Sequence, residues 1–290
     1  MKRAITLSVV ASVASVAALA LSAQVVGARA HRASEAPRAH VVAAKTLSAE
    51  PEQSEFRWHG ALAAGRVIEI KGVNGSVEAE PSSSGEVEVL AVKRARRSNP
   101  DDVRIEVVQH GGGVTICAVY PNIDGLEPNT CAPGSGGHVN VRDNDTSVNF
   151  TVRVPAGVRF TGHTVNGKVS AENLSADVDA STVNGSVSVS TTGLARAHTV
   201  NGSITASMGR ADWEGEMEFK TVNGGIDVSF PSGLSAEVEA KTLNGEITSD
   251  FPLTVQGTFS RRHMNGTIGG GGRGLRLETV NGSVQIRRAT

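Results

Sequence analysis

The chain has 290 residues and a formal net charge of −1, with 28 Lys and Arg against 29 Asp and Glu, and it combines 3% aromatic residues with 33 glycines. A chain so close to neutrality has no bulk electrostatic attraction for nucleic acid, so we expect no nucleic-acid partner. The scarcity of aromatic residues excludes a wide core built around large rings and predicts a narrow interior of Val, Ile, Ala and Thr.

The amino terminus, residues 1–30, has the pattern of a secretory signal peptide. Two basic residues precede an apolar run over residues 4–23, and the small residues Ala28 and Ala30 occupy the −3 and −1 positions of a cleavage site. The alternatives are cleavage after Ala23 and retention of the run as a membrane anchor, which would be the one route to membrane association. We therefore expect an exported protein, located in the periplasm, at the cell surface or outside the cell.

Two regions lie between the signal peptide and the regular repeats. Residues 31–55 are rich in Ala, Glu, Ser and Pro with little periodicity, which predicts a flexible lead-in. Residues 56–158 are β-rich, with a first strand near residues 56–58, and we expect them to form a cap or a separate sheet. Cys117 and Cys131 flank a segment rich in Pro, Asn and Gly, and in an exported chain this pair predicts a disulfide.

A repeat of about twenty residues, centred on Asn-Gly, occupies residues 159–290, and one further copy precedes it. The residue directly before Asn is always apolar, the residue three after it is always Val or Ile, and the residue two before it is Thr except at Gly72 and His263. Four before Asn the residues are small or apolar, although Arg261 breaks the column. These alternating columns predict strands with one buried face. The asparagines are Asn74, Asn166, Asn184, Asn201, Asn223, Asn244, Asn265 and Asn281.

Two architectures fit the repeat. Asn-Gly between alternating runs is typical of a type I′ hairpin, which would give an antiparallel meander. In the alternative, a parallel β-solenoid, each repeat is one coil, Asn-Gly forms a corner, and stacked Asn side chains can hydrogen-bond as a ladder. A hairpin would leave the apolar residue before each Asn exposed opposite the inward Thr, whereas a corner can turn both inward. We therefore predict an all-β parallel solenoid.

The column three before Asn suggests an anion-binding stripe. Lys220, Lys241 and Arg262 would lie on three consecutive coils about 4.8 Å apart, an arrangement able to hold an anionic polymer. In the alternative interpretation, Glu218 and Glu239 on the same face neutralise the stripe in ordinary surface ion pairs.

Three pairs of acidic residues raise the possibility of glycoside cleavage. Residues 177/179, 216/218 and 237/239 are each two apart on a strand, which places the carboxylates about 6.8 Å apart on one face. A general acid needs a cleft that raises its pKa, and the pattern puts these pairs on an open face without aromatic residues, which argues against an enzyme.

The repeated Thr-Val-Asn-Gly-x-Val/Ile, together with the run Thr-Val-Arg-Val-Pro-Ala-Gly at residues 151–157, resembles the bacterial putative-adhesin family of exported β-strand-repeat proteins, a domain of unknown function. The resemblance covers roughly residues 60–290. It implies an extracytoplasmic, solenoid-like domain with no established catalytic residues, so that no active site can be transferred.

These observations favour an exported, non-enzymatic β-repeat protein, a structural or adhesive module of the cell envelope whose partner is an envelope polymer or protein. The first alternative is an envelope-stress or signalling accessory that binds an anionic envelope component or a membrane protein, through the stripe or the basic cluster at residues 93–97. The second is a polysaccharide-active enzyme on a β-helix. We expect no cofactor and no metal, and an open solenoid end makes self-association possible.

Overall fold

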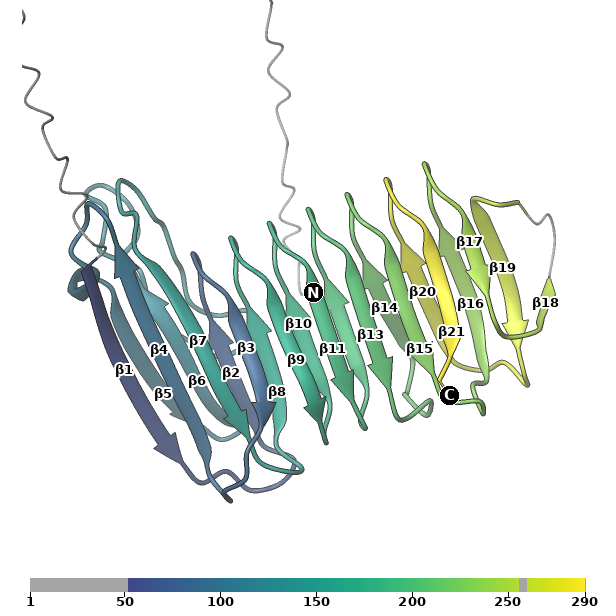
Figure 1. The fold of residues 1–290 in the computed structure, drawn as a ribbon, viewed down its shortest axis with the longest axis horizontal. Coiled ribbons are helices and arrows are strands. Elements are labelled where there is room, and N and C mark those ends of the chain that lie inside the picture. The colour runs from purple at the N-terminus through teal and green to yellow at the C-terminus, as the bar shows by residue number, and fades with distance from the viewer. Residues whose placement is uncertain (1–51, 256–259, 290) are drawn as a thin grey trace, which may run out of the picture. The chain divides into compact units, whose positions relative to one another are not determined.

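The computed structural model describes residues 52–255 and 260–289, and in these residues the chain folds into two sheets and one short 3-10 helix, η1 (Pro100–Asp102) (Figure 1). Sheet A holds, in spatial order, β1 (Glu52–Gly60), β4 (Val87–Ala95), β7 (Ser147–Val154), β3 (Val77–Pro81), β9 (Val169–Leu174), β11 (Val187–Thr191), β13 (Ile204–Met208), β15 (Ile226–Phe230), β21 (Val284–Arg288) and β17 (Ile247–Ser249). Sheet B holds β18 (Leu253–Val255), β19 (His263–Ile268), β16 (Ala236–Lys241), β20 (Gly274–Glu278), β14 (Glu216–Lys220), β12 (Ala195–His198), β10 (Val178–Ser181), β8 (Arg159–His163), β2 (Val67–Lys71), β6 (Gly113–Val119) and β5 (Arg104–His110).

The predicted signal peptide and most of the lead-in lie outside the described residues. The lead-in was expected to extend to residue 55, but β1 already begins at Glu52. None of the described residues forms a helix long and apolar enough to cross a membrane.

Each repeat is one coil of a parallel solenoid. A strand of sheet B runs to an Asn-Gly corner and continues into a strand of sheet A, and the equivalent strands of neighbouring coils pair in parallel. Val178 of β10 pairs with Ala195 of β12, and Val187 of β11 pairs with Ile204 of β13, so equivalent repeat positions stack. The predicted solenoid is confirmed, and the hairpin alternative is wrong.

The order of the coils in space differs from their order in the sequence at both ends. The last coil, β20 and β21, lies between the β14–β15 coil and the β16–β17 coil. The first coil, β2 and β3, likewise lies between the β6–β7 coil and the β8–β9 coil. The region 56–158 therefore contributes strands to both sheets of the stack instead of forming a sheet of its own.

Antiparallel strands complete each end of the stack. β4 and β1 extend sheet A beyond β7, β5 pairs with β6, and β19 and β18 extend sheet B beyond β16. Within the described residues the edge strands are β1, β5, β17 and β18. Self-association by strand pairing would have to use one of these edges.

The corners pack their backbones so closely that only glycine fits. A Cβ atom added to Gly202 would lie 2.0 Å from the carbonyl oxygen of Gly185 in the next coil, and the same contact recurs along the stack. The buried Thr199 hydroxyl donates a hydrogen bond to that same carbonyl at 2.8 Å. The Thr and Gly columns of the sequence thus meet at one carbonyl in each coil.

A ladder of asparagine amides runs beside these contacts. Six asparagines each donate from Nδ2 to the Oδ1 of the Asn in the neighbouring coil, at 2.7–2.8 Å, and Asn74 at the end of the ladder only accepts. All eight asparagines lie in the described part of the chain, and seven of them take part in the ladder. Their spatial order is Asn74, Asn166, Asn184, Asn201, Asn223, Asn281 and Asn244.

Asn265 is not a corner, contrary to the sequence interpretation. It lies within β19, which runs antiparallel to β16, and it pairs with Glu239. Its copy has His263 in place of Thr and Arg261 in place of a small or apolar residue. The copy at Asn74 still forms a corner although Gly72 replaces its Thr, but it keeps the apolar Ile70, whereas the copy at Asn265 lacks both the Thr hydroxyl and the small or apolar residue.

Four of the apolar residues directly before a corner Asn are exposed and do not turn inward as expected, although Val73 packs against the core. Val165, Val183 and Val200 are 38–39% exposed and Leu243 is 60% exposed, while the neighbouring threonines are buried. Burial of these residues therefore does not distinguish the solenoid from a hairpin meander, and the expectation that the corners bury them was wrong. The stack itself is stabilised by its inward Val, Ile, Ala and Phe residues, such as Ile204, Val228 and Phe219.

Gly202→Ala is expected to destabilise the protein by about 2–3 kcal/mol, because the new methyl group meets backbone atoms that cannot move without separating two coils. Guanidinium unfolding measures the change. Gly233→Ala, at a site with open space around the new Cβ, is the control and should change the free energy of unfolding little. Equal effects of the two substitutions would contradict the corner contact.

Candidate functional site

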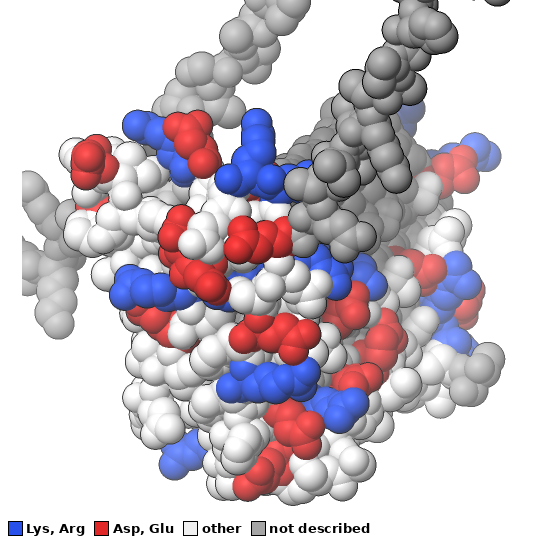
Figure 2. All heavy atoms as spheres, turned by 60° about the vertical axis from the view of Figure 1, so that its left-hand side comes forward, with Lys and Arg blue, Asp and Glu red and all other residues white. Residues whose placement is uncertain are grey.

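The expected basic stripe is interrupted on the outer face of sheet B. Because β20 lies between β14 and β16, Glu278 stands between Lys220 and Lys241. The Glu278 carboxylate forms an ion pair with Lys220 at 3.3 Å. Arg262 precedes β19, where His263 is the register partner of Lys241. The three basic residues are therefore not on consecutive coils. Figure 2 shows acidic and basic side chains interleaved over the face that it presents.

One member of each acidic pair on this part of sheet B, Glu218 and Glu239, belongs to an ion-pair network. Arg276 lies between Glu218 at 3.7 Å and Glu239 at 3.9 Å, and it also contacts Glu278 at 3.5 Å. Lys241 pairs with Glu239, and its hydrogen bond is the main reason that the pKa of Glu239 is lowered, with the charge of Arg276 acting in the same direction. A glycosidase acid needs the opposite shift.

The basic cluster at residues 93–97 is also tied to partners. Lys93 is buried and donates to Asp101 at 3.1 Å and to the carbonyl oxygen of Val103 at 3.2 Å. Arg97 pairs with Asp145 at 3.6 Å, and backbone N–H groups led by that of Ser98 lower the pKa of Asp145 to about 2. The cluster is not one continuous patch, since Lys93 is buried and bound away from solvent.

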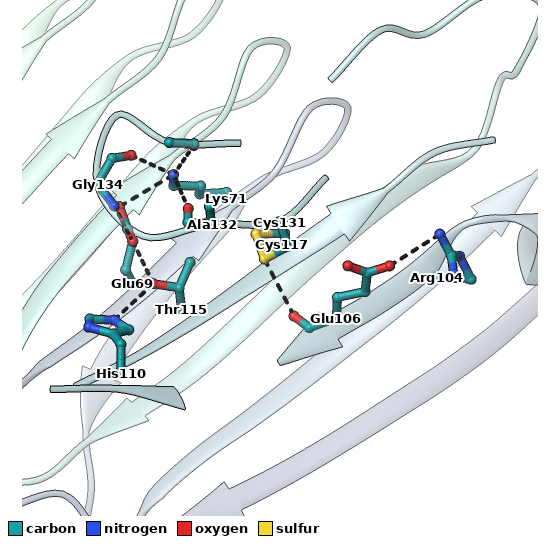
Figure 3. The surroundings of a disulfide bond; sticks show 11 residues. Glu69, Lys71, Arg104, Glu106, His110, Thr115, Cys117, Cys131, Ala132 and Gly134 are labelled. Carbon is teal, nitrogen blue, oxygen red and sulfur yellow. Dashed lines mark hydrogen bonds and ion pairs between the residues drawn. A yellow bond between two sulfur atoms is a disulfide. The ribbon is translucent and has the colours of Figure 1, made fainter. Parts of the chain in front are cut away.

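The segment that follows the disulfide covers part of the outer face of sheet B, at β2. The predicted bond between Cys117 of β6 and Cys131 is present, with the two Cα atoms 5.7 Å apart. From Cys131 the chain passes over β2, where its backbone contacts side chains that point out of the sheet (Figure 3). We call residues 131–137 the disulfide loop.

Lys71 and Glu69 hold the disulfide loop against the sheet. The Lys71 ammonium donates to three loop carbonyl oxygens, those of Ala132 at 2.6 Å, Gly134 at 2.5 Å and Gly136 at 3.0 Å. Glu69, whose side chain is 6% exposed, accepts from the Gly134 N–H at 3.1 Å and lies 3.8 Å from Lys71. Every hydrogen bond here involves an ionised group, the kind that contributes most in proteins.

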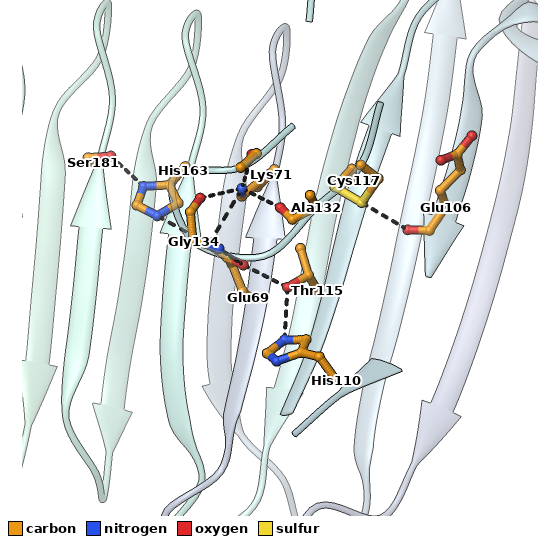
Figure 4. A network of polar contacts seen from close by, with 12 residues as sticks. Glu69, Lys71, Glu106, His110, Thr115, Cys117, Ala132, Gly134, His163 and Ser181 are labelled. Atoms are coloured by element: carbon orange, nitrogen blue, oxygen red, sulfur yellow. Dashed lines mark hydrogen bonds and ion pairs between the residues drawn. A yellow bond between two sulfur atoms is a disulfide. The ribbon is translucent and has the colours of Figure 1, made fainter. Parts of the chain in front are cut away.

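Two histidines extend this network in opposite directions (Figure 4). His163 Nδ1 lies 2.5 Å from the Ser181 hydroxyl, and its Nε2 lies 3.8 Å from Glu69. On the other side, Thr115 donates to Glu69 at 2.7 Å and contacts His110 at 3.2 Å. Burial lowers the pKa of His163, against the opposing charges of Asp179 and Glu69.

The repeat pattern by itself indicates neither the role of His163 nor that of Glu69. One signal was available, because Glu69 and Lys71 stand two apart in a strand whose neighbours along the sheet come from distant parts of the chain. The sequence does not show, however, that both side chains bind the backbone of the disulfide loop. Within residues 52–255 and 260–289, no three His, Cys, Asp or Glu side chains are placed to share a metal ion.

Comparison with known proteins places the fold. The family model described as Toastrack DUF4097 matches residues 66–287, which confirms the resemblance seen in the repeats. No curated protein matches the chain.

Two solved structures are similar to this chain at low identity. One is "a putative cell adhesion protein" from Clostridium sporogenes, with a TM-score of 0.40, 12% identity, and coverage of 83% of this chain and 100% of that chain. The other is "a putative adhesin" from Bacteroides fragilis, with a TM-score of 0.35, 12% identity, and coverage of 82% and 99%. At these TM-scores the likeness decides neither fold nor function.

Lys71→Met is expected to destabilise the protein by about 3–5 kcal/mol, because it leaves the Glu69 carboxylate buried without a compensating charge. The double variant Glu69→Gln/Lys71→Met should recover much of that loss. Urea unfolding with the disulfide intact measures the coupling free energy of the pair. Lys168→Met, at the exposed Lys168–Glu78 pair, is the control and should change stability by about 1 kcal/mol or less. Additive single and double effects would contradict the network.

Acidification is expected to destabilise the protein through His163. The folded pKa of His163 is lowered from the unfolded value of about 6.5, so the unfolded chain binds more protons and stability falls as the pH drops from 7 through that value. The free energy of unfolding, measured at several pH values, should therefore depend less on pH in His163→Gln. His59→Gln removes an exposed histidine as a control. A His163→Gln curve parallel to that of the wild type would contradict the assignment.

Proposed function

The chain belongs to the Toastrack DUF4097 family, and we propose that it is an exported, non-enzymatic module of the cell envelope with a structural or adhesive role. The observation that carries the proposal is the continuous stack. Seven corners joined by Asn side chains, backbone bonds and Thr hydroxyls hold the coils in fixed register. A surface held in this way suits extended contact with a polymer or protein, because little conformational entropy is lost on binding.

The disulfide supports export. Disulfides persist in oxidising compartments such as the periplasm and the cell surface, and a structural Cys117–Cys131 bond is uncommon in a cytosolic protein. Binding of an anionic polymer is not supported by the Lys220 and Lys241 column, since Glu278 separates the two lysines. We therefore propose contact through shape and hydrogen bonding over several coils, with an envelope polymer or protein as the partner.

Cosedimentation of the purified intact protein with envelope fragments of the source bacterium tests this role. Saturable binding that persists at high salt is expected, because contact through a face of paired charges depends little on ionic strength. Lys220→Glu/Lys241→Glu is the matched variant and should bind as the wild type does.

No saturable binding, or equal binding to cytosolic material, would refute the envelope role. Loss of binding in Lys220→Glu/Lys241→Glu together with loss at high salt would favour an anion-binding accessory instead.

A further inference from the structure

A hollow of about 370 Å³ lies on the outer face of sheet B, beside the disulfide loop. Across the strands, Glu69, Thr161, Asp179 and Arg196 are successive register neighbours, from β2 through β8 and β10 to β12. The short Thr161 is the low point of this row, between the loop-covered Glu69 and the longer Arg196. Gly134 of the disulfide loop lines the hollow on the side of β2.

Besides Glu69, four charged side chains line the hollow, and none of these four makes an ion pair within the described residues. Arg159 and Arg196 lie on the strands to either side of β10, which carries Asp179 and is preceded directly by Asp177. Their polar contacts are to backbone. Arg159 Nε donates to the carbonyl oxygen of Gly65 at 3.0 Å, and Asp177 accepts from the N–H of Leu194 at 3.0 Å. Farther along the same face, by contrast, Arg276, Glu218 and Glu278 are all paired.

The inner wall of the hollow adds little net charge. The Glu69 carboxylate is compensated by Lys71, and His163 stands half-buried beside it. The two arginines and two aspartates also sum to zero. A ligand that matches this wall is neutral overall but carries separate positive and negative groups. Glu69 is buried, Asp177 and Asp179 are half-buried, and Arg159 and Arg196 are exposed to solvent.

We propose that this pocket binds a small zwitterion, a free amino acid or dipeptide, with its carboxylate on Arg196 or Arg159 and its ammonium group on Asp179 and Asp177. Guanidinium groups bind carboxylates in bidentate geometry, and two carboxylates satisfy the donors of one ammonium group. Adjacent strands lie about 4.8 Å apart, so the two ends of a glycine or glycylglycine molecule can reach both signs of charge. The site does not depend on the proposed envelope role.

Isothermal titration of the purified intact protein with glycine and glycylglycine tests the site. Saturable binding is expected for at least one of the two probes, and the preferred probe distinguishes a free amino acid from a dipeptide. N-acetylglycylglycine lacks the ammonium group and glycylglycinamide lacks the carboxylate, and each should bind at least about tenfold more weakly than glycylglycine, a difference of about 1.4 kcal/mol.

Asp179→Asn and Arg196→Gln should each weaken binding of the preferred probe at least about tenfold, since each removes one charged contact. Asp227→Asn and Arg287→Gln are the matched controls, because these residues form a 2.8 Å ion pair outside the hollow, on strands of sheet A. They should leave binding unchanged. Thermal unfolding of all four variants checks that they are folded. The absence of saturable binding to either probe, equal binding of the capped compounds, or equal loss in the controls would overturn the proposal.

Discussion

The close approach of backbones at the Asn-Gly corners is the contact on which the rest of the structure depends. At six of the seven corners the glycine lies against the carbonyl of the neighbouring corner glycine, and a buried threonine hydroxyl bonds that same carbonyl. This contact sets the coil spacing at both sheets. Because every outward residue is then a fixed number of positions from a corner, the rows on the outer faces align, and residues such as Glu69 and Asp179 fall into one column. The polar network and the hollow beside it are consequences of this alignment.

The solenoid could be predicted from sequence because each column of the repeat meets a local physical requirement. Gly leaves room for backbone, Thr reaches the carbonyl next to it, and Val or Ile packs inward three residues later. Asn265 has the Asn-Gly pair but lacks both the Thr and the small or apolar residue four before Asn, whereas Asn74 lacks only the Thr and still forms a corner. An Asn-Gly pair alone is therefore a weaker signal than the complete column, and the exceptions at His263 and Arg261 carried more information than the matches.

The spatial order of the coils could not be read from the same columns. The repeat around Asn281 satisfies the corner requirements as well as that around Asn223, so it can stack on either side of a neighbour without changing any local pattern. That order interrupts the predicted basic stripe, because it places Glu278 between Lys220 and Lys241. The hollow was equally hidden, because two cysteines predict a bond but do not say which strand the segment that follows Cys131 will cover.

The disulfide and the Lys71–Glu69 pair constrain the same loop by different means. The covalent bond acts mainly by limiting the unfolded chain, and it fixes only Cys131 to β6. The buried ion pair contributes little net stability once desolvation is counted, but its three carbonyl contacts specify where the loop lies over β2. A loop held by the disulfide alone could swing across β8 and fill the space above Thr161. Together the two constraints keep Gly134 at the rim of the hollow. The Lys71–Glu69 pair therefore acts by selecting one arrangement of the loop, and this arrangement gives the proposed ligand site one defined wall.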